Sequence, residues 1–134
     1  MIDASVAMSW CFEDEISSYA DAVLDCLERL TALVPSIWPL EIGNVLCVAE
    51  RKKRIRTADG DQLIGLLSEL PIIVVPEPPE RMFREILTLA RKCNLSTYDA
   101  AYLDLAMKRK IPIATLDEKL LGAAAKCRVP NFEP

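Results

Sequence analysis

Four acidic residues stand where the sequence predicts the starts of helices, and they are Asp3, Glu41, Asp99 and Asp117. Asp3 and Asp117 also directly follow predicted strands, and the carboxyl ends of parallel strands meet at one edge of a sheet. Carboxylates gathered at one edge repel one another, and a divalent cation relieves that repulsion. Oxygen ligands suit Mg²⁺ or Mn²⁺, and a cation held by carboxylates can activate water for attack on phosphorus. The four acids together therefore predict a metal-dependent hydrolase of phosphate esters.

Each acid also has a purely structural interpretation. Asp3 and Asp117 fit N-caps of the helices that follow them. Glu41 lies in a first turn, where a negative charge suits the helix dipole. Asp99 stands three residues after Ser96, which is close to a capping box with Asp in place of Glu. Taken singly, each acid leaves the capping interpretation open, and only their convergence favours a site.

The composition excludes several other kinds of chemistry. The chain has no histidine, which removes Ser-His-Asp, Cys-His and histidine-ligated metal sites. Its 4 glycines form no phosphate-cradling motif. Its 5 cysteines show no C-x-x-C spacing, so we expect buried free thiols and a cytoplasmic protein. No apolar run approaches the roughly 20 residues of a membrane span, and no signal peptide is visible.

Apolar periodicity predicts strands that alternate with helices along a single domain of 134 residues. The predicted strands are residues 1–3, 32–37, 71–76, 111–115 and 129–132, and the predicted helices are residues 6–12, 17–33, 38–54, 58–70, 78–93, 97–110 and the segment after Asp117. The strand at 71–76 is apolar throughout, as in a sheet covered on both faces. The helix at 97–110 is apolar nearly all round and is therefore expected to be central and buried. This order predicts an α/β fold, with a central parallel β-sheet and α-helices on both faces.

Four short stretches, which occur in a fixed order, carry a family resemblance. They read D-A-S-V-A at 3–7, P-L-E-I-G-N-V-L at 39–46, L-S-T-Y-D-A-A-Y at 95–102 and A-T-L-D at 114–117. In this combination the chain resembles a PIN domain of the VapC toxin type. The resemblance extends over nearly the whole chain, and it implies one PIN domain over residues 1–134.

The resemblance also implies a function. It points to a metal-dependent endoribonuclease that hydrolyses RNA with Mg²⁺ or Mn²⁺, forms a homodimer and pairs with a cognate antitoxin protein. It carries the catalytic and metal-binding roles onto the four acids. Ser5 and Thr115 match small hydroxyl positions that line such sites, and Asn44, one helical turn after Glu41, matches a position that orients this glutamate. Only Met1 and Ile2 precede Asp3, so we expect either a short first strand or a chain that begins late.

Three other functions remain open from the residues alone. An aspartate-based phosphatase or dehalogenase typically carries D-x-D after the first strand, and here the third position is Ser5. A phospho-acceptor receiver needs an acid pair after the first strand and a lysine after the last core strand, and that lysine is missing near Asp117. A non-catalytic binding module on the same fold is the third alternative.

Other polar and aromatic residues have simpler interpretations. Asp104 lies about 140° around a helix from Asp99, so the two cannot share a face, and we expect a polar contact or a surface position. Basic clusters at residues 51–56 and 108–110 either complement helix C-termini or bind RNA or the antitoxin, despite a net charge of -4. The large aromatic residues expected in the core are Trp10, Trp38 and Tyr98.

Overall fold

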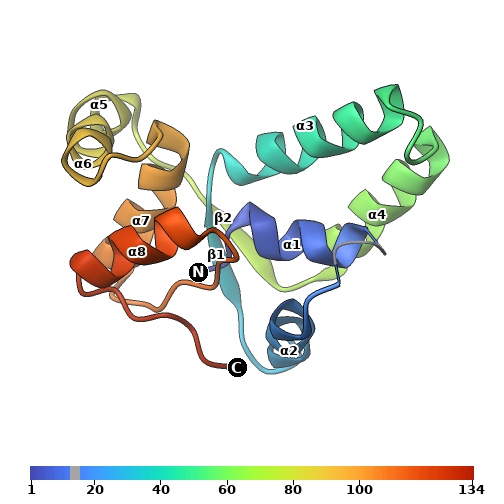
Figure 1. Ribbon diagram of the computed structural model, residues 1–134, viewed down its shortest axis with the longest axis horizontal. Coiled ribbons are helices and arrows are strands. Elements are labelled where there is room, and N and C mark those ends of the chain that lie inside the picture. The colour runs from blue at the N-terminus through green and yellow to red at the C-terminus, as the bar shows by residue number, and fades with distance from the viewer. Residues whose placement is uncertain (13–15) are drawn as a thin grey trace.

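The computed structural model describes residues 1–12 and 16–134, which form helices around a parallel sheet (Figure 1). The helices are α1 (Ala4–Cys11), α2 (Ser18–Cys26), α3 (Trp38–Arg51), α4 (Thr57–Glu69), α5 (Pro79–Arg81), the π-helical η1 (Met82–Ile86), α6 (Leu87–Cys93), α7 (Thr97–Arg109) and α8 (Glu118–Lys126). Figure 1 shows α1 to α4 on one side of the strands and α5 to α8 on the other. The predicted α/β architecture, with helices on both faces of the sheet, is confirmed.

The sheet is built from two regular strands and shorter parallel segments. β1 (Ala32–Pro35) pairs in parallel with β2 (Ile72–Val75). On the other side of β1, the Ile2 N–H donates to the Leu33 carbonyl at 3.3 Å. The Asp3 N–H then donates to the Ala114 carbonyl at 2.9 Å, and Ile113 in turn bridges Asn131 in parallel. The order across the sheet is therefore 131, 113–114, 1–3, β1 and β2, which puts Asp3 near its middle.

The prediction that strand 71–76 is covered on both faces is wrong. Ile73 is 53% exposed and Val74 42% exposed, and only Ile72 and Val75 pack against the core. Within the described residues, β2 pairs with β1 alone and so forms the edge of the sheet. An apolar run in the sequence cannot distinguish a central strand from an edge strand, because both are rich in β-branched residues.

Several predicted boundaries also shift. The helix expected over 17–33 ends at Cys26, and Leu33 belongs to β1. The apolar spacing continued past Cys26 because the next strand is buried in the same core. The helix expected over 78–93 is confirmed as the series α5, η1 and α6, which includes a π-helical turn. The strands expected at 111–115 and 129–132 are reduced to isolated bridges, at Ile113 and Ala114 in the first and at Asn131 in the second.

Helix α7 is central, as predicted. It packs on β1 and on α8, and its inward face is buried at Ala100, Tyr102, Leu103, Leu105 and Ala106. Ser96 caps it by accepting a hydrogen bond from the Asp99 N–H. The expected core position is confirmed for Trp38, but it is wrong for Tyr98, which is 57% exposed in the first turn of α7. Trp10 is half-buried, and its indole N–H donates to the Ala20 carbonyl at 2.8 Å.

Ion pairs connect separate segments in the second half of the chain. Arg81 donates to both carboxylate oxygens of Asp104, at 3.0 and 2.8 Å, which confirms Asp104 as a polar contact. Lys108 pairs with Glu77 at 3.0 Å. Basic residues occupy the last turns of α3 and α7, where they complement the helix dipole. No helix in the described part of the chain is long and apolar enough to cross a membrane.

The structure joins none of the 5 cysteines in a disulfide bond, and none of them is fully buried, contrary to the expected burial. Two of them, Cys93 at the end of α6 and Cys127 after α8, approach each other with 3.7 Å between their Sγ atoms. The S–S distance in a disulfide bond is about 2.05 Å, so the two sulfur atoms are in contact but not bonded.

We therefore predict that mild oxidation with a disulfide such as oxidised glutathione links Cys93 to Cys127. The two thiols lose their protons and two electrons, and the oxidant is reduced to two thiols. Peptide mapping by mass spectrometry should find this bridge as the main intramolecular product. Cys127→Ser should abolish it and Cys47→Ser should not, and a bridge between any other two cysteines would contradict the prediction.

Candidate active site

Asp3 is a buried carboxylate fixed by three donors. It ends the first strand segment and forms the N-cap of α1, with only 7% of the residue exposed. Its Oδ1 accepts the Ala4 N–H at 2.7 Å. Its Oδ2 accepts the Ser5 hydroxyl at 2.6 Å and the Thr115 hydroxyl at 2.8 Å. The structure thus brings both predicted hydroxyl residues onto Asp3.

The same two hydroxyls connect Asp3 to the loop that precedes α8. The Ser5 oxygen accepts the Leu116 N–H at 3.0 Å, and the Thr115 oxygen accepts the Asp117 N–H at 3.0 Å. Each hydroxyl therefore accepts from a backbone amide and donates to the carboxylate. This chain of hydrogen bonds locks the start of α1 to the start of α8.

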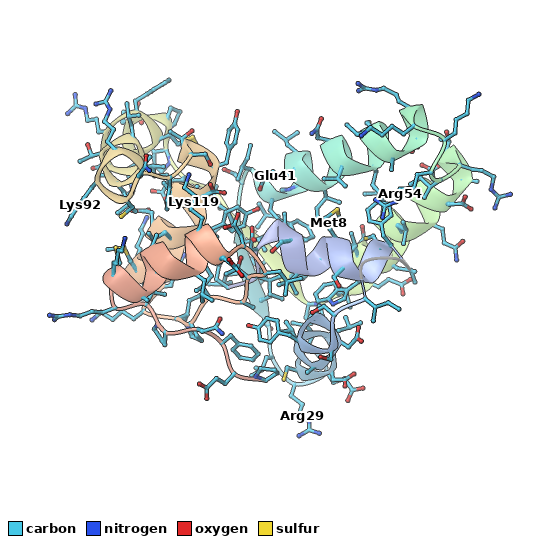
Figure 2. All side chains as sticks on the ribbon, viewed as in Figure 1. Met8, Arg29, Glu41, Arg54, Lys92 and Lys119 are labelled. Atoms are coloured by element: carbon cyan, nitrogen blue, oxygen red, sulfur yellow. The ribbon has the colours of Figure 1, made fainter. Side chains whose placement is uncertain are left out.

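Glu41 lies in the first turn of α3, and Pro39 is the second residue of that helix. Figure 2 labels Glu41 at the end of α3 that lies above the start of α1. Its Oε2 accepts a hydrogen bond from the hydroxyl of Tyr102, a fully buried residue of α7. One hydrogen bond thus joins α3 to α7 at the site.

Burial is the main cause that destabilises the charged forms of Asp3 and Glu41. Burial raises the pKa of Asp3, against the opposing effect of hydrogen bonds from Ser5, Thr115 and Ala4. Burial is also the largest cause of the raised pKa of Glu41; the Tyr102 hydrogen bond opposes it, and the charges of Asp3 and Asp99 add to it. Burial and the neighbouring Glu41 raise the pKa of Tyr102, so its hydroxyl remains a donor at neutral pH.

Asp117 caps α8, as the capping interpretation predicts, whereas α7 is capped by Ser96 and Asp99 hydrogen-bonds the Ser96 side chain. Asp99 accepts the Ser96 hydroxyl at 2.7 Å, and its N–H donates back to Ser96 at 3.0 Å. Asp117 accepts the N–H groups of Lys119 and Leu120 at 2.7 and 2.9 Å. The negative charge of Asp99 contributes to the raised pKa of Glu41. The Asp117 carboxylate is directed into α8, and within the described ranges it forms no hydrogen bond with the other three acids.

The donor set fits a divalent cation, although the acids do not form a closed cage. Among the residues that the structure describes, no three acids lie close enough together to hold a metal ion as they stand. None of the ion pairs between described residues involves Asp3, Glu41 or Asp99. Buried carboxylates are ordinarily paired with a positive charge. Asp3 and Glu41 are hard oxygen donors that lack one, and this is the environment that Mg²⁺ or Mn²⁺ suits.

Two residues differ from the expected roles. Asn44 is exposed on α3, and the described residues include no hydrogen bond from it to Glu41. Tyr102 makes that contact instead, and the sequence analysis assigned it no role. The sequence does indicate that Tyr102 lies near Asp99, because residues three apart share a helix face.

The sequence profile of the PIN domain family matches residues 1–126. The chain belongs to the PIN domain family. The crystal structure of PAE2754 from Pyrobaculum aerophilum is similar, with a TM-score of 0.68 and 27% sequence identity over 91% of this chain and 76% of that chain. Among curated proteins, none matches the chain. PIN domains are generally metal-dependent nucleases.

We predict that Glu41→Gln stabilises the metal-free PIN domain, and that the gain grows as the pH rises. The folded state raises the pKa of Glu41 above its ordinary value of 4.5, so the unfolded chain ionises first. Stability is then lost as the pH rises from about that value through the raised pKa. Glutamine keeps an oxygen for Tyr102 but carries no charge. Melting curves in EDTA between pH 4 and 8 measure the difference from wild type.

Asp59→Asn is a control for which we expect the opposite change in stability. A hydrogen bond from Arg56 lowers the pKa of Asp59 to about 2, so this acid stabilises the fold above its ordinary value of 3.8. The variant should melt below wild type at neutral pH, and the difference should shrink as the pH falls towards 2. A Glu41→Gln variant that melts below wild type at every pH would show that the carboxylate is not destabilised by its surroundings.

Proposed function

We propose that this PIN domain is an endoribonuclease of the VapC type, the toxin of a toxin–antitoxin pair, which hydrolyses RNA phosphodiester bonds with Mg²⁺ or Mn²⁺. The observation that carries the proposal is a pair of carboxylates, the buried Asp3 and the half-buried Glu41, which have raised pKa values and no cationic partner among the described residues. Four helices, α1, α3, α7 and α8, carry these acids, Asp99 and Asp117 at their N-termini. Helix N-termini favour a phosphate, which supports an RNA substrate.

The residues divide the work between them. Asp3 and Glu41 would hold the cation, with Asp99 adding negative charge beside Glu41 and Asp117 fixing the start of α8. When bound, the cation supplies a Lewis acid that polarises the phosphate and favours deprotonation of water. Water attacks phosphorus in line, its proton passes to a site carboxylate, and the bond from phosphorus to the 3′ oxygen breaks. The products are a 3′-hydroxyl, which takes up a proton, and a 5′-phosphate. A raised pKa makes a carboxylate a better base for this step.

We predict that Asp3→Asn and Asp99→Asn each reduce cleavage of single-stranded RNA by about 100-fold or more, because each removes charge that stabilises the transition state. EDTA should abolish cleavage, and Mn²⁺ should restore it. The same cation should stabilise the wild-type fold by about 2.7 kcal/mol at 100 times its dissociation constant. Gel assays of RNA and melting curves measure the two effects.

Asp61→Asn is the matched control for this loss of activity, since Asp61 is an exposed acid of α4 away from the site. It should cleave RNA like wild type. Cleavage that persists in EDTA, or in Asp3→Asn, would refute the metal-dependent mechanism. Mn²⁺ binding without any cleavage would instead favour the non-catalytic module.

We further propose a homodimer that also binds a cognate antitoxin. An apolar groove of about 470 Å³ lies beside the site, between the starts of α3 and α7 and the segment α5–η1. Leu40 and Phe83 line it and are 70% and 77% exposed. Leu40 precedes Glu41, so a second copy seated here would lie next to the catalytic acids. Exposed apolar side chains of this size are typical of a surface that another chain covers.

We predict that Phe83→Asp converts the dimer into a monomer, because a carboxylate in the middle of an apolar interface loses its water without gaining a partner. Light scattering at micromolar concentration measures the mass. Leu30→Asp, which changes an exposed leucine after α2 in the same way, should leave the dimer intact. A wild-type monomer under these conditions would contradict the proposed assembly.

A further inference from the structure

The hydroxyl of Tyr102 is the one group that fixes the Glu41 carboxylate by a hydrogen bond in the part of the chain described. Tyr102 lies on α7 and Glu41 on α3, 61 residues apart in the sequence. Tyr102 is fully buried, so solvent does not reach its hydroxyl. A buried hydroxyl needs a partner, and the contact to Oε2 satisfies both groups at once.

Helix α7 carries two groups that act on the same glutamate, Asp99 through its charge and Tyr102 through a hydrogen bond. Asp99 and Tyr102 are three residues apart and share a face of the helix. The charge of Asp99 reaches Glu41, and the hydroxyl of Tyr102 donates to it. Asp99 alone would push the glutamate side chain away, because like charges repel. Tyr102 opposes that repulsion, since a hydrogen bond to a charged oxygen is a strong one.

Glu41 depends on this contact more than Asp3 depends on any one of its own. Asp3 accepts from Ala4, Ser5 and Thr115. Glu41 is only half-buried and has three rotatable bonds, and one donor restricts it. Its Oε1 accepts no hydrogen bond from the described residues and is left for another ligand.

We propose that Tyr102 is a positioning residue, which holds Oε2 of Glu41 so that the carboxylate stays beside Asp3 and Asp99 and can bind a divalent cation. The inference rests on the proposed metal-dependent function. Groups that hydrogen-bond a metal ligand typically contribute 10- to 100-fold to metal affinity, because they orient the ligand before the metal arrives.

Mn²⁺ binding without RNA tests the proposal, by calorimetry and by the electron paramagnetic resonance signal of free Mn²⁺. Tyr102→Phe removes one oxygen and keeps the ring that fills the core. The dissociation constant of this variant for Mn²⁺ should rise about 10-fold or more. The double variant Tyr102→Phe with Glu41→Gln should bind no more weakly than Glu41→Gln alone, because the tyrosine acts through the glutamate.

Tyr19→Phe controls for the loss of a hydrogen-bonded hydroxyl elsewhere, since Tyr19 donates to the Phe132 carbonyl at 2.9 Å. It should bind Mn²⁺ like wild type, with each variant measured well below its own melting midpoint. Affinity of Tyr102→Phe within about twofold of wild type would overturn the positioning role and leave the proposed function standing. Additive losses in the double variant would also overturn it. A folded wild-type protein that binds no Mn²⁺ would instead refute the proposed function itself, and the positioning role with it.

Discussion

Burying the charge of Asp3 beside other carboxylates, without a cation from the described residues, is the constraint on which the site depends. The strand order places Asp3 near the middle of the sheet, where water cannot solvate it. Two hydroxyls and one backbone amide compensate in part, and the raised pKa of Asp3 shows that they do so incompletely. The fold therefore holds an electrostatic strain that a divalent cation would relieve. The catalysis that we propose would depend on the same side chains that carry this strain.

Capping and catalysis are compatible uses of these acids. A cap places a carboxylate at a helix N-terminus, and the ends of several helices meet where parallel strands end. Asp3 caps α1 through Oδ1 and keeps Oδ2 for Ser5 and Thr115. Asp99 accepts the hydroxyl of Ser96, the N-cap of α7, and still raises the pKa of Glu41. The PIN domain thus gathers negative charge with positions that also start its helices. Asp117 differs, because its carboxylate oxygen is used by the first amides of α8.

The sequence predicts local features of this fold well and long-range features poorly. Helix α7 was predicted within one residue, because Ser96 caps it and the cap is a local interaction. The helix over 17–33 was extended too far, because a buried strand continues the apolar pattern of a buried helix. The exposure of Ile73 follows from the strand order, which no local pattern encodes. Ser5 and Thr115 were found by resemblance, whereas Tyr102 was missed because its partner lies 61 residues away. The PIN family itself was predicted from four short stretches in a fixed order.

Asp3 and Glu41 differ in how firmly they are held, and this difference suggests how the two could share one cation. Asp3 is fixed by the sheet and by three donors, so its position follows from the fold. Glu41 is half-buried on the first turn of α3, and a side-chain contact from another helix restricts it. In the proposed function, Glu41 would reach a cation held at Asp3 through its own side-chain torsions, since only the hydroxyl of Tyr102 restrains it among the described residues. In the proposed function, Asp3 would set where the cation lies, and Glu41 would complete its coordination.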